Sequence, residues 1–256
     1  MSKYRVLAVD LDGTLLNDES LIEESTKYWI KKASEMGVTT VFSTGRGLPR
    51  VKHFMNELQL NAPMVLVNGG EVWRDYERVH SRYFLDNEHV RQLHQLAVEH
   101  GAHYWGYNLE AIVGPKSWTD EMFEVDWLKF GMSHKDDETM RYLWKTVEEW
   151  GIVEVTGKSH QSMEITVKGI TKESGLREVC EFMDISMDEI IAVGDGPNDY
   201  EMIKAAGLGV AMGNADEEIK KVADVITDTN VNDGVAKVIQ QYICGLSPQE
   251  VAQSSK

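Results

Sequence analysis

The sequence predicts an α/β fold in which a mainly parallel sheet is interrupted by an inserted α+β unit. Two observations support this fold class. At both ends of the chain, short β-branched and apolar runs alternate with amphipathic segments, as in a parallel sheet with crossover helices. Between them, from about residue 85 to residue 167, the order becomes helix, two strands, helix and two strands. A chain of 256 residues can bury the cores of both units.

Apolar runs and helical periodicity place the elements of the predicted core in order. Its first half should contain a strand at 4–9, a helix at 23–36, a strand at 38–43, a helix at 48–58, a strand at 64–67 and a hairpin at 71–84. Its second half should contain a helix at 171–183, a strand at 190–193, a helix at 199–206, a strand at 208–212, a helix at 216–222, a strand at 223–227 and a helix at 235–243.

The inserted unit is predicted to form a cap. Its elements should be a helix at 88–100, strands at 104–108 and 110–114, a helix at 138–150, and strands at 152–157 and 163–168. A Trp-rich stretch without assigned structure precedes the second helix. The predicted domains are a discontinuous core over 1–84 and 168–246, an inserted α/β cap over 85–167 and a flexible polar tail over 247–256.

Composition excludes several classes of partner. A formal net charge of -16 would repel nucleic acid and anionic membranes from most of the surface. The two cysteines, Cys180 and Cys244, form no disulfide framework or metal-binding spacing, which fits a reducing cytoplasm. No signal-peptide pattern or apolar membrane span is visible. We therefore expect a cytoplasmic monomer or small homo-oligomer.

Polar residues follow four predicted core strands at the point where each strand ends. The apolar runs continue into DLDGT, STGR, NGG and GDGPND. In an open parallel sheet, ligands bind at the carboxyl ends of the strands, so these four loops should form one site. Asp10 and Asp12 flank a residue that points the other way on an extended chain, so both carboxylates can face one cavity. Asp195 can supply a third carboxylate.

Three converging acids predict a metal ion. At an effective dielectric of about 20 they would repel one another by several kcal/mol unless a cation lay between them. Oxygen ligands of this kind suit Mg²⁺, which usually keeps coordination positions for water and substrate phosphate. Thr44 and Gly45 offer a hydroxyl and backbone donors for such a phosphate, and Lys172 adds a positive charge at a helix start.

Each of these residues has an ordinary structural explanation when taken alone. A single Asp10 is typical of a solvated strand end, and a single Lys172 is typical of a surface. Asn198 and Asp199 could simply satisfy backbone donors at the start of a helix. Four loops with complementary chemistry at positions that should converge favour a functional site instead.

The motifs themselves are recognisable. AVDLDGTLL, FSTGR, the lysine of ITKESGL and VGDGPND resemble, in order, the four signature motifs of the haloacid dehalogenase (HAD) superfamily of phosphohydrolases. The whole chain is similar to the Cof-like subgroup, in which an α/β cap lies between the second and third motifs. The resemblance implies a Rossmann-like, HAD-like core.

The resemblance also implies roles for individual residues. Asp10 would be the nucleophile that forms an aspartyl-phosphate, and Asp12 would protonate the leaving alcohol and then activate water. The main-chain carbonyl of Asp12 would bind Mg²⁺. Catalysis would involve Asp10, Asp12, Thr44 and Lys172. The phosphate would be bound by Leu11, Thr44, Gly45, Lys172 and Asn198. The metal ligands would be Asp10, Asp12 and Asp195, with Asp199 in support.

The function that we expect is Mg²⁺-dependent hydrolysis of a small phosphate ester, such as a sugar phosphate or a phosphorylated cofactor or nucleotide precursor. A phosphotransferase or phosphomutase of the same superfamily is the alternative. A phospho-accepting signalling or regulatory protein is more remote, because such a module needs no cap. The first strand runs into DLDG and not into G-x-G-x-x-G, which excludes a dinucleotide-binding turn.

Aromatic residues are concentrated in the cap. They are Trp105, Trp118, Trp127, Trp144 and Trp150, with Tyr104, Tyr107 and Phe123. Some of them could stack on a flat substrate, whereas packing of the cap core would use the same residue types. The sequence leaves both explanations open.

Overall fold

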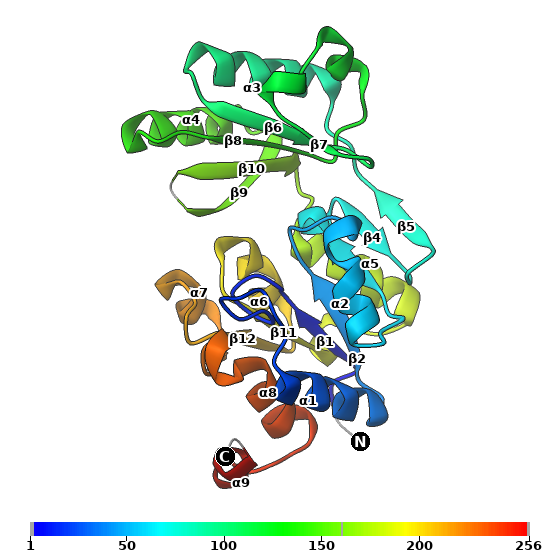
Figure 1. Cartoon of the computed structure of the whole chain (residues 1–256). Coiled ribbons are helices and arrows are strands. Elements are labelled where there is room, and N and C mark those ends of the chain that lie inside the picture. Colours follow the sequence, from blue (N-terminus) through cyan, green and yellow to red (C-terminus); the bar gives the residue numbers. More distant parts are fainter. Residues whose placement is uncertain (1–2, 160, 255–256) are drawn as a thin grey trace.

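Two sheets organise the chain, which is described here from a computed structural model covering residues 3–159 and 161–254. An eight-stranded sheet forms the core and a five-stranded sheet forms the cap above it (Figure 1). Core strands from the two ends of the chain lie side by side, because β1 pairs with both β2 and β11. The predicted fold class, a parallel-sheet core with an inserted α+β cap, is therefore confirmed.

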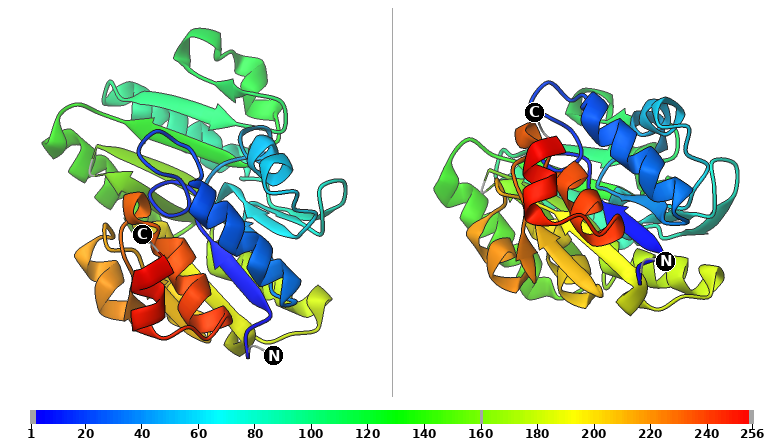
Figure 2. Two further views of the ribbon diagram at one scale, coloured as in Figure 1. Left: turned by 60° about the horizontal axis from the view of Figure 1, so that its bottom comes forward. Right: turned by 90° about the horizontal axis from the view of Figure 1, so that it is seen from below.

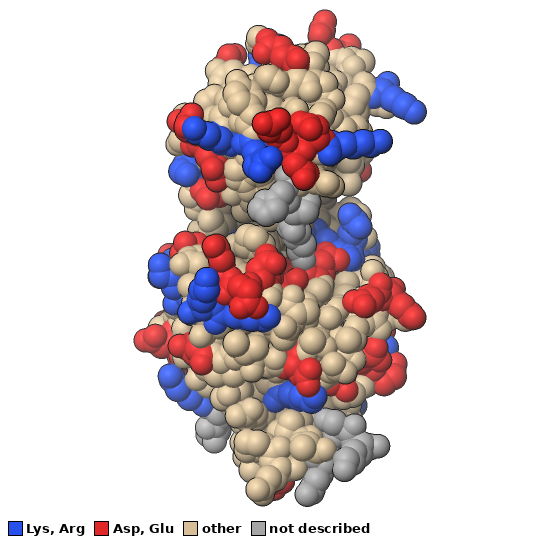
Figure 3. Space-filling view, turned by 90° about the vertical axis from the view of Figure 1, so that its left-hand side faces the viewer, with Lys and Arg blue, Asp and Glu red and all other residues tan. Residues whose placement is uncertain are grey.

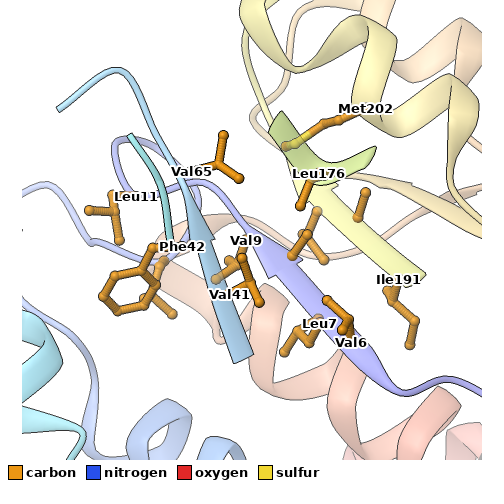
Figure 4. Packing of buried hydrophobic residues seen from close by; sticks show 14 of the residues in the cluster. Val6, Leu7, Val9, Leu11, Val41, Phe42, Val65, Leu176, Ile191 and Met202 are labelled. Carbon is orange, nitrogen blue, oxygen red and sulfur yellow. The ribbon is translucent and has the colours of Figure 1, made fainter. Parts of the chain in front are cut away.

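The core sheet is parallel except at one edge, where β3, β4 and β5 pair antiparallel. In spatial order its strands are β13 (Val225–Ile226), β12 (Leu208–Ala211), β11 (Ile190–Gly194), β1 (Val6–Val9), β2 (Thr39–Ser43), β3 (Met64–Leu66), β4 (Glu71–Trp73) and β5 (Val79–Arg82). All four residues of β1 are buried, as expected for a central strand that is covered on both faces. Val9 and Val41 from neighbouring strands pack in this core (Figure 4).

Helices lie on both sides of the core sheet (Figure 2). They are α1 (Glu24–Glu35), α2 (Lys52–Glu57), α5 (Lys172–Met183), α6 (Tyr200–Ala205), α7 (Glu217–Val222), α8 (Gly234–Val238), its π-helical continuation η8 (Ile239–Ile243), and α9 (Pro248–Ser254). Short 3-10 helices are η1 (Leu48–Arg50), η2 (Val67–Gly69), η5 (Met187–Glu189), η6 (Pro197–Asp199) and η7 (Asn230–Asn232). Among the described residues, every helix is too short or too polar to cross a bilayer.

The cap sheet is antiparallel throughout. In spatial order its strands are β7 (Ile112–Val113), β6 (His103–Tyr107), β8 (Lys129–Ser133), β10 (Ser162–Val167) and β9 (Val153–Ser159). Its helices are α3 (Asn87–Glu99), α4 (Asp137–Trp150), η3 (Pro115–Ser117) and η4 (Asp120–Glu124). The two long helices cover the face that is turned away from the core (Figure 1), so the opposite face of the sheet looks toward the core.

Two segments differ from the sequence-based expectation. Strand β8, the central strand of the cap, lies where the sequence predicted only an irregular Trp-rich stretch. Lys129 and two small residues in KFGMS weaken the apolar pattern, so the strand is identified by its pairing with β6 and β10. In the tail that was predicted to be flexible, the structure has helix α9, with Ser247 accepting from and donating to Glu250 and with Val251 buried.

Candidate active site

The four loops predicted to converge do meet at one edge of the core sheet. Asp10 follows β1, Thr44 follows β2, Asn68 follows β3, and Asp195 follows β11. Lys172 begins α5 and lies at the same edge. A cavity of about 380 Å³ lies between this edge and the cap. Its lining combines the core residues Asp10, Asp12, Gly45, Arg46, Arg50 and Asn198 with the cap residues Trp105, Lys129, Thr156, Gly157, Ser162 and Glu164.

Lys172 joins two carboxylates in the interior. Its Nζ lies 2.7 Å from Asp10 Oδ1 and 2.6 Å from Asp199 Oδ1, and the side chain is fully buried. Burial acts to lower the pKa of Lys172, but attraction to Asp10 and then to Asp199 outweighs it and raises the pKa above its ordinary value. A capping box between Thr171 and Ser174 starts α5 and fixes Lys172 at its first position.

Asp199 organises the loop that follows β11. Its Oδ2 accepts hydrogen bonds of 3.0 Å from the backbone N–H groups of Asp195 and Gly196, while its Oδ1 binds Lys172. Desolvation raises the pKa of the Asp199 carboxyl, with Lys172 opposing that rise and Asp10 adding to it. Its carboxylate thus accepts three hydrogen bonds, which fix this loop and Lys172 relative to each other. The supporting role of Asp199 in catalysis stays a prediction.

The acidic cluster fits a divalent cation. Asp10, Asp195 and Asp199 each offer a carboxylate oxygen, and these atoms lie within 4.8 Å of one another. Carboxylate oxygens that lie this close together are the hard ligands that a divalent cation such as Mg²⁺ takes. Asp195 is oriented by a 3.0 Å hydrogen bond that its Oδ1 accepts from the Thr14 hydroxyl.

The Asp12 carboxylate lies outside the acidic cluster and pairs with Arg46. It accepts two hydrogen bonds from Arg46, at 2.8 Å from Nε and 2.5 Å from Nη2, and the Asp12 side chain is 43% exposed. The acidic cluster therefore contains Asp199 in place of the Asp12 carboxylate. Metal binding by the main-chain carbonyl of Asp12 stays a prediction. Sequence reasoning missed Arg46, although it is the last residue of FSTGR and directly follows the proposed phosphate-binding loop.

The remaining predicted phosphate ligands lie in the same region. Thr44 is buried, and its hydroxyl accepts a 3.2 Å hydrogen bond from the backbone N–H of Arg46. Gly45 lines the cavity, and its carbonyl accepts a 3.0 Å hydrogen bond from Lys129 of the cap. The side chain of Leu11 is buried in the core, so a phosphate would contact this residue through its backbone.

A chain of hydrogen bonds connects the core loops to the cap. Asn198 Nδ2 donates to Asn68 Oδ1 at 3.0 Å, and Asn68 Nδ2 donates to Glu164 Oε2 at 3.2 Å. Glu164 Oε1 in turn accepts from Lys129 at 2.7 Å. Asn68 has a φ of 55°, which an Asn tolerates better than most residues. The NGG loop thus contributes to the site directly, and Lys129 and Glu164 are contributions that the sequence did not reveal.

The structure separates the roles of the cap aromatics. Trp127 is fully buried and its indole N–H donates to the carbonyl of Met122 at 2.7 Å. Trp118 stacks on Trp127, with ring centroids 5.0 Å apart. Both belong to the cap core, whereas Trp105 lines the cavity that contains Asp10.

Comparisons with known proteins agree with this geometry. Residues 7–143 and 125–239 match the profile of the haloacid dehalogenase-like hydrolases. The chain is 36% identical over 239 residues to the 5-amino-6-(5-phospho-D-ribitylamino)uracil phosphatase YcsE of Bacillus subtilis, covering 93% of this chain and 96% of that protein. It is 28% identical over 273 residues to the pyridoxal phosphate phosphatase YbhA of Escherichia coli, covering 93% and 98%.

A solved structure shows the same architecture. The haloacid dehalogenase-like hydrolase from Bacillus subtilis superposes with a TM-score of 0.86 at 25% sequence identity. The match covers 92% of this chain and 99% of that protein, so it includes both the core and the cap.

Proposed function

The chain belongs to the family of haloacid dehalogenase-like hydrolases, and from this premise we propose that it is a Mg²⁺-dependent phosphatase of small phosphorylated metabolites. The observation that carries the proposal is the buried contact of Lys172 with Asp10, beside Asp195 and Asp199. Asp10 also lines the cavity of about 380 Å³. This arrangement places a carboxylate, a fixed positive charge and a metal-binding cluster around one point.

In the first step, a carboxylate oxygen of Asp10 forms a bond to phosphorus while the bond from phosphorus to the ester oxygen breaks. Asp12 in its protonated form gives its proton to the departing oxygen, which leaves as an alcohol. Lys172 and Thr44 hold the oxygens of the transferring group. A divalent cation held by Asp10 and Asp195 would offset the negative charge that develops there, and Mg²⁺ suits such an oxygen site.

In the second step, water attacks the phosphorus of the aspartyl-phosphate. Asp12, now ionised, takes a proton from that water, and the bond between phosphorus and the Asp10 oxygen breaks. Inorganic phosphate is released and both acids return to their starting states. The pair of hydrogen bonds from Arg46 keeps the Asp12 carboxylate in one orientation between the two steps.

The relatives suggest which esters to test first. One is named for a phosphorylated ribitylaminouracil and another for pyridoxal phosphate. We propose phosphorylated cofactor precursors of this kind as the substrate class.

Metal dependence and the nucleophile are tested together by measuring released phosphate. The chelator-treated protein should be inactive toward p-nitrophenyl phosphate and toward these esters, and added Mg²⁺ should restore turnover because the acidic cluster needs a cation. Asp10→Asn should lower kcat by at least ~10⁴-fold, since the amide is no nucleophile. Circular dichroism of the variant provides the control for folding. Full activity without metal, or normal turnover in Asp10→Asn, would contradict the mechanism.

A further inference from the structure

The catalytic cavity continues into a second chamber. A cavity of about 540 Å³ shares six lining residues with the first: Gly45, Arg46, Arg50, Trp105, Lys129 and Glu164. Asp10 and Asp12 line only the first chamber, whereas His103, Tyr107 and Ile112 line only the second. The second chamber therefore lies beyond the phosphoryl site, on the side of strands β6 and β7. A substrate that extends past its phosphate has room there.

One row of residues across the cap sheet contributes Trp105 and Glu164 to both chambers. Trp105 on β6 pairs with Gly131 on β8, which pairs with Glu164 on β10, which pairs with Thr156 on β9. Side chains alternate between the faces of a strand, and the neighbouring Tyr104 is buried in the cap core. The Trp105 row therefore lies on the face that looks toward the catalytic core.

Because Gly131 has no side chain, the Trp105 indole can pack against the backbone of β8. A Cβ atom at Gly131 would overlap the Trp105 indole, so the ring lies directly over the backbone of β8. On the opposite face, a Cβ at Gly106 would overlap Trp127 in the same way. Trp127 is fully buried in the cap core, whereas Trp105 keeps partial exposure and lines both chambers. One ring packs the cap, and the other presents an aromatic face to the cavity.

A partly buried ion pair, Lys129–Glu164, lies beside that aromatic face. Lys129 Nζ is 2.7 Å from Glu164 Oε1 and 3.0 Å from the Gly45 carbonyl, and both side chains line both chambers. The pair presents ammonium N–H donors and carboxylate acceptors at one place. Adjacent hydroxyl groups, each of which donates and accepts, match this combination.

We propose that the cap selects an elongated leaving group: a hydroxylated chain bound at the Lys129–Glu164 pair, followed by a planar ring that stacks on Trp105. The substrate class is then a phosphate monoester of a polyol chain that carries a planar heterocycle, and not a compact sugar phosphate. This inference rests on the proposed phosphatase function, and it makes Trp105 a specificity-determining residue.

The test compares three esters in the presence of Mg²⁺. One is 5-amino-6-(5-phospho-D-ribitylamino)uracil, which has chain and ring. Ribitol 5-phosphate has the chain alone, and p-nitrophenyl phosphate reports the core chemistry without a polyol chain. Trp105→Ala should lower kcat/KM for the ring-bearing ester by about 10-fold to 100-fold, the scale of base stacking on an aromatic side chain. It should change kcat/KM for ribitol 5-phosphate by less than about 2-fold, because that ester has no ring to stack.

Three further variants sharpen the comparison. Trp105→Phe keeps an aromatic face and should retain most of the preference for the ring-bearing ester. Trp150→Ala removes a cap tryptophan at the end of α4 that packs against the cap core, and it should keep the wild-type ratio of kcat/KM between the two ribityl esters. Glu164→Gln removes the carboxylate from the ion pair. It should lower kcat/KM for both ribityl esters relative to kcat/KM for p-nitrophenyl phosphate.

The outcomes separate this inference from the proposed function. If no ester releases phosphate, the phosphatase function is wrong and the inference falls with it. If all esters react but Trp105→Ala lowers kcat/KM equally for both ribityl esters, the stacking role is wrong while the phosphatase function stands. A wild-type preference for ribitol 5-phosphate over the ring-bearing ester would overturn the inference in the same way.

Discussion

At the scale of single residues, Arg46 shows how one side chain can position another. Its guanidinium holds the Asp12 carboxylate through two hydrogen bonds, and its own backbone N–H donates to Thr44. The planar fork of Arg matches a carboxylate in a way that the single ammonium of Lys does not. Arg46 is thus a positioning residue in the proposed mechanism, because it fixes the group that exchanges protons with the substrate.

We expect Arg46→Lys to lower kcat by about 10-fold to 100-fold. A general acid that is displaced by about 1 Å reduces the rate on that order. The charge is kept, so the fold should be unaffected. Arg177→Lys, at an exposed residue of α5 that pairs with Glu173, serves as the control and should match the wild type. Steady-state kinetics with p-nitrophenyl phosphate gives the readout. An Arg46→Lys variant with wild-type kcat would show that Asp12 needs no second donor.

At the scale of elements, the loop after β1 and the loop after β11 fit together through a glycine. Gly13 has a φ of +83°, and a Cβ atom there would overlap the Asp195 carboxylate. The absence of a side chain at Gly13 therefore lets Asp195 approach Asp10. Gly37, at the end of α1, has the same φ of +83° but has nothing within 4 Å of its would-be Cβ. These two glycines provide a matched pair.

Both Gly13→Ala and Gly37→Ala should lose about 1 kcal/mol of stability, because each forces alanine into a left-handed conformation. Only Gly13→Ala should also displace Asp195. We expect its half-saturating Mg²⁺ concentration to rise by about 10-fold to 100-fold, as for other changes that misplace metal ligands. Titration of activity with Mg²⁺ and thermal unfolding measure the two effects. Equal Mg²⁺ requirements in the two variants would contradict a role for Gly13 in the metal site.

At the scale of the whole molecule, the site exists only where the two lobes face each other. Figure 3 shows the cap and the core as two lobes joined at a waist, with acidic and basic side chains mixed over both. Tyr107 of β6 crosses this junction, since a Cβ atom at Gly47 of the core would overlap its hydroxyl. Desolvation, with a smaller contribution from Glu71 and an opposing one from Arg82, raises the pKa of Tyr107 to about 12.

This raised pKa predicts an alkaline weakening of the cap–core contact. The neutral phenol is favoured in the folded protein, so its contribution to stability is complete below the unfolded pKa of about 10. It should be lost as the pH rises from about 10 to about 12. Tyr107→Phe has no group to ionise, so its stability relative to the wild type should increase over that range. Tyr142→Phe, at an exposed tyrosine, is the control. Urea unfolding at several pH values provides the measurement, and a constant difference between the proteins would refute the prediction.

Much of the core site could be predicted from the sequence by itself. The β-α alternation sets the parallel sheet, and the carboxyl ends of its strands must lie at one edge, so Asp10, Thr44 and Asp195 were expected to meet. Lys172 was expected to join them because it offers a positive charge at a helix start, where a phosphate could bind. These conclusions depend on the hydrophobic periodicity of each segment and on the order of the elements along the chain. Both can be read from the sequence.

Only the tertiary structure shows which side chains the site residues contact. The sequence could not show that Asp12 binds Arg46 while Asp199 joins the acidic cluster, because carboxylates a few residues apart differ only in the direction that packing gives them. It also could not distinguish Trp105 from Trp127, since the same Trp–Gly pairing occurs on both faces of the cap sheet. The pairing of β8 with β6 and β10 determines which side chains lie on each face of the cap sheet. Such long-range contacts leave no periodic signal in the chain. The residues on the cap side of the pocket could therefore be identified only from the tertiary structure.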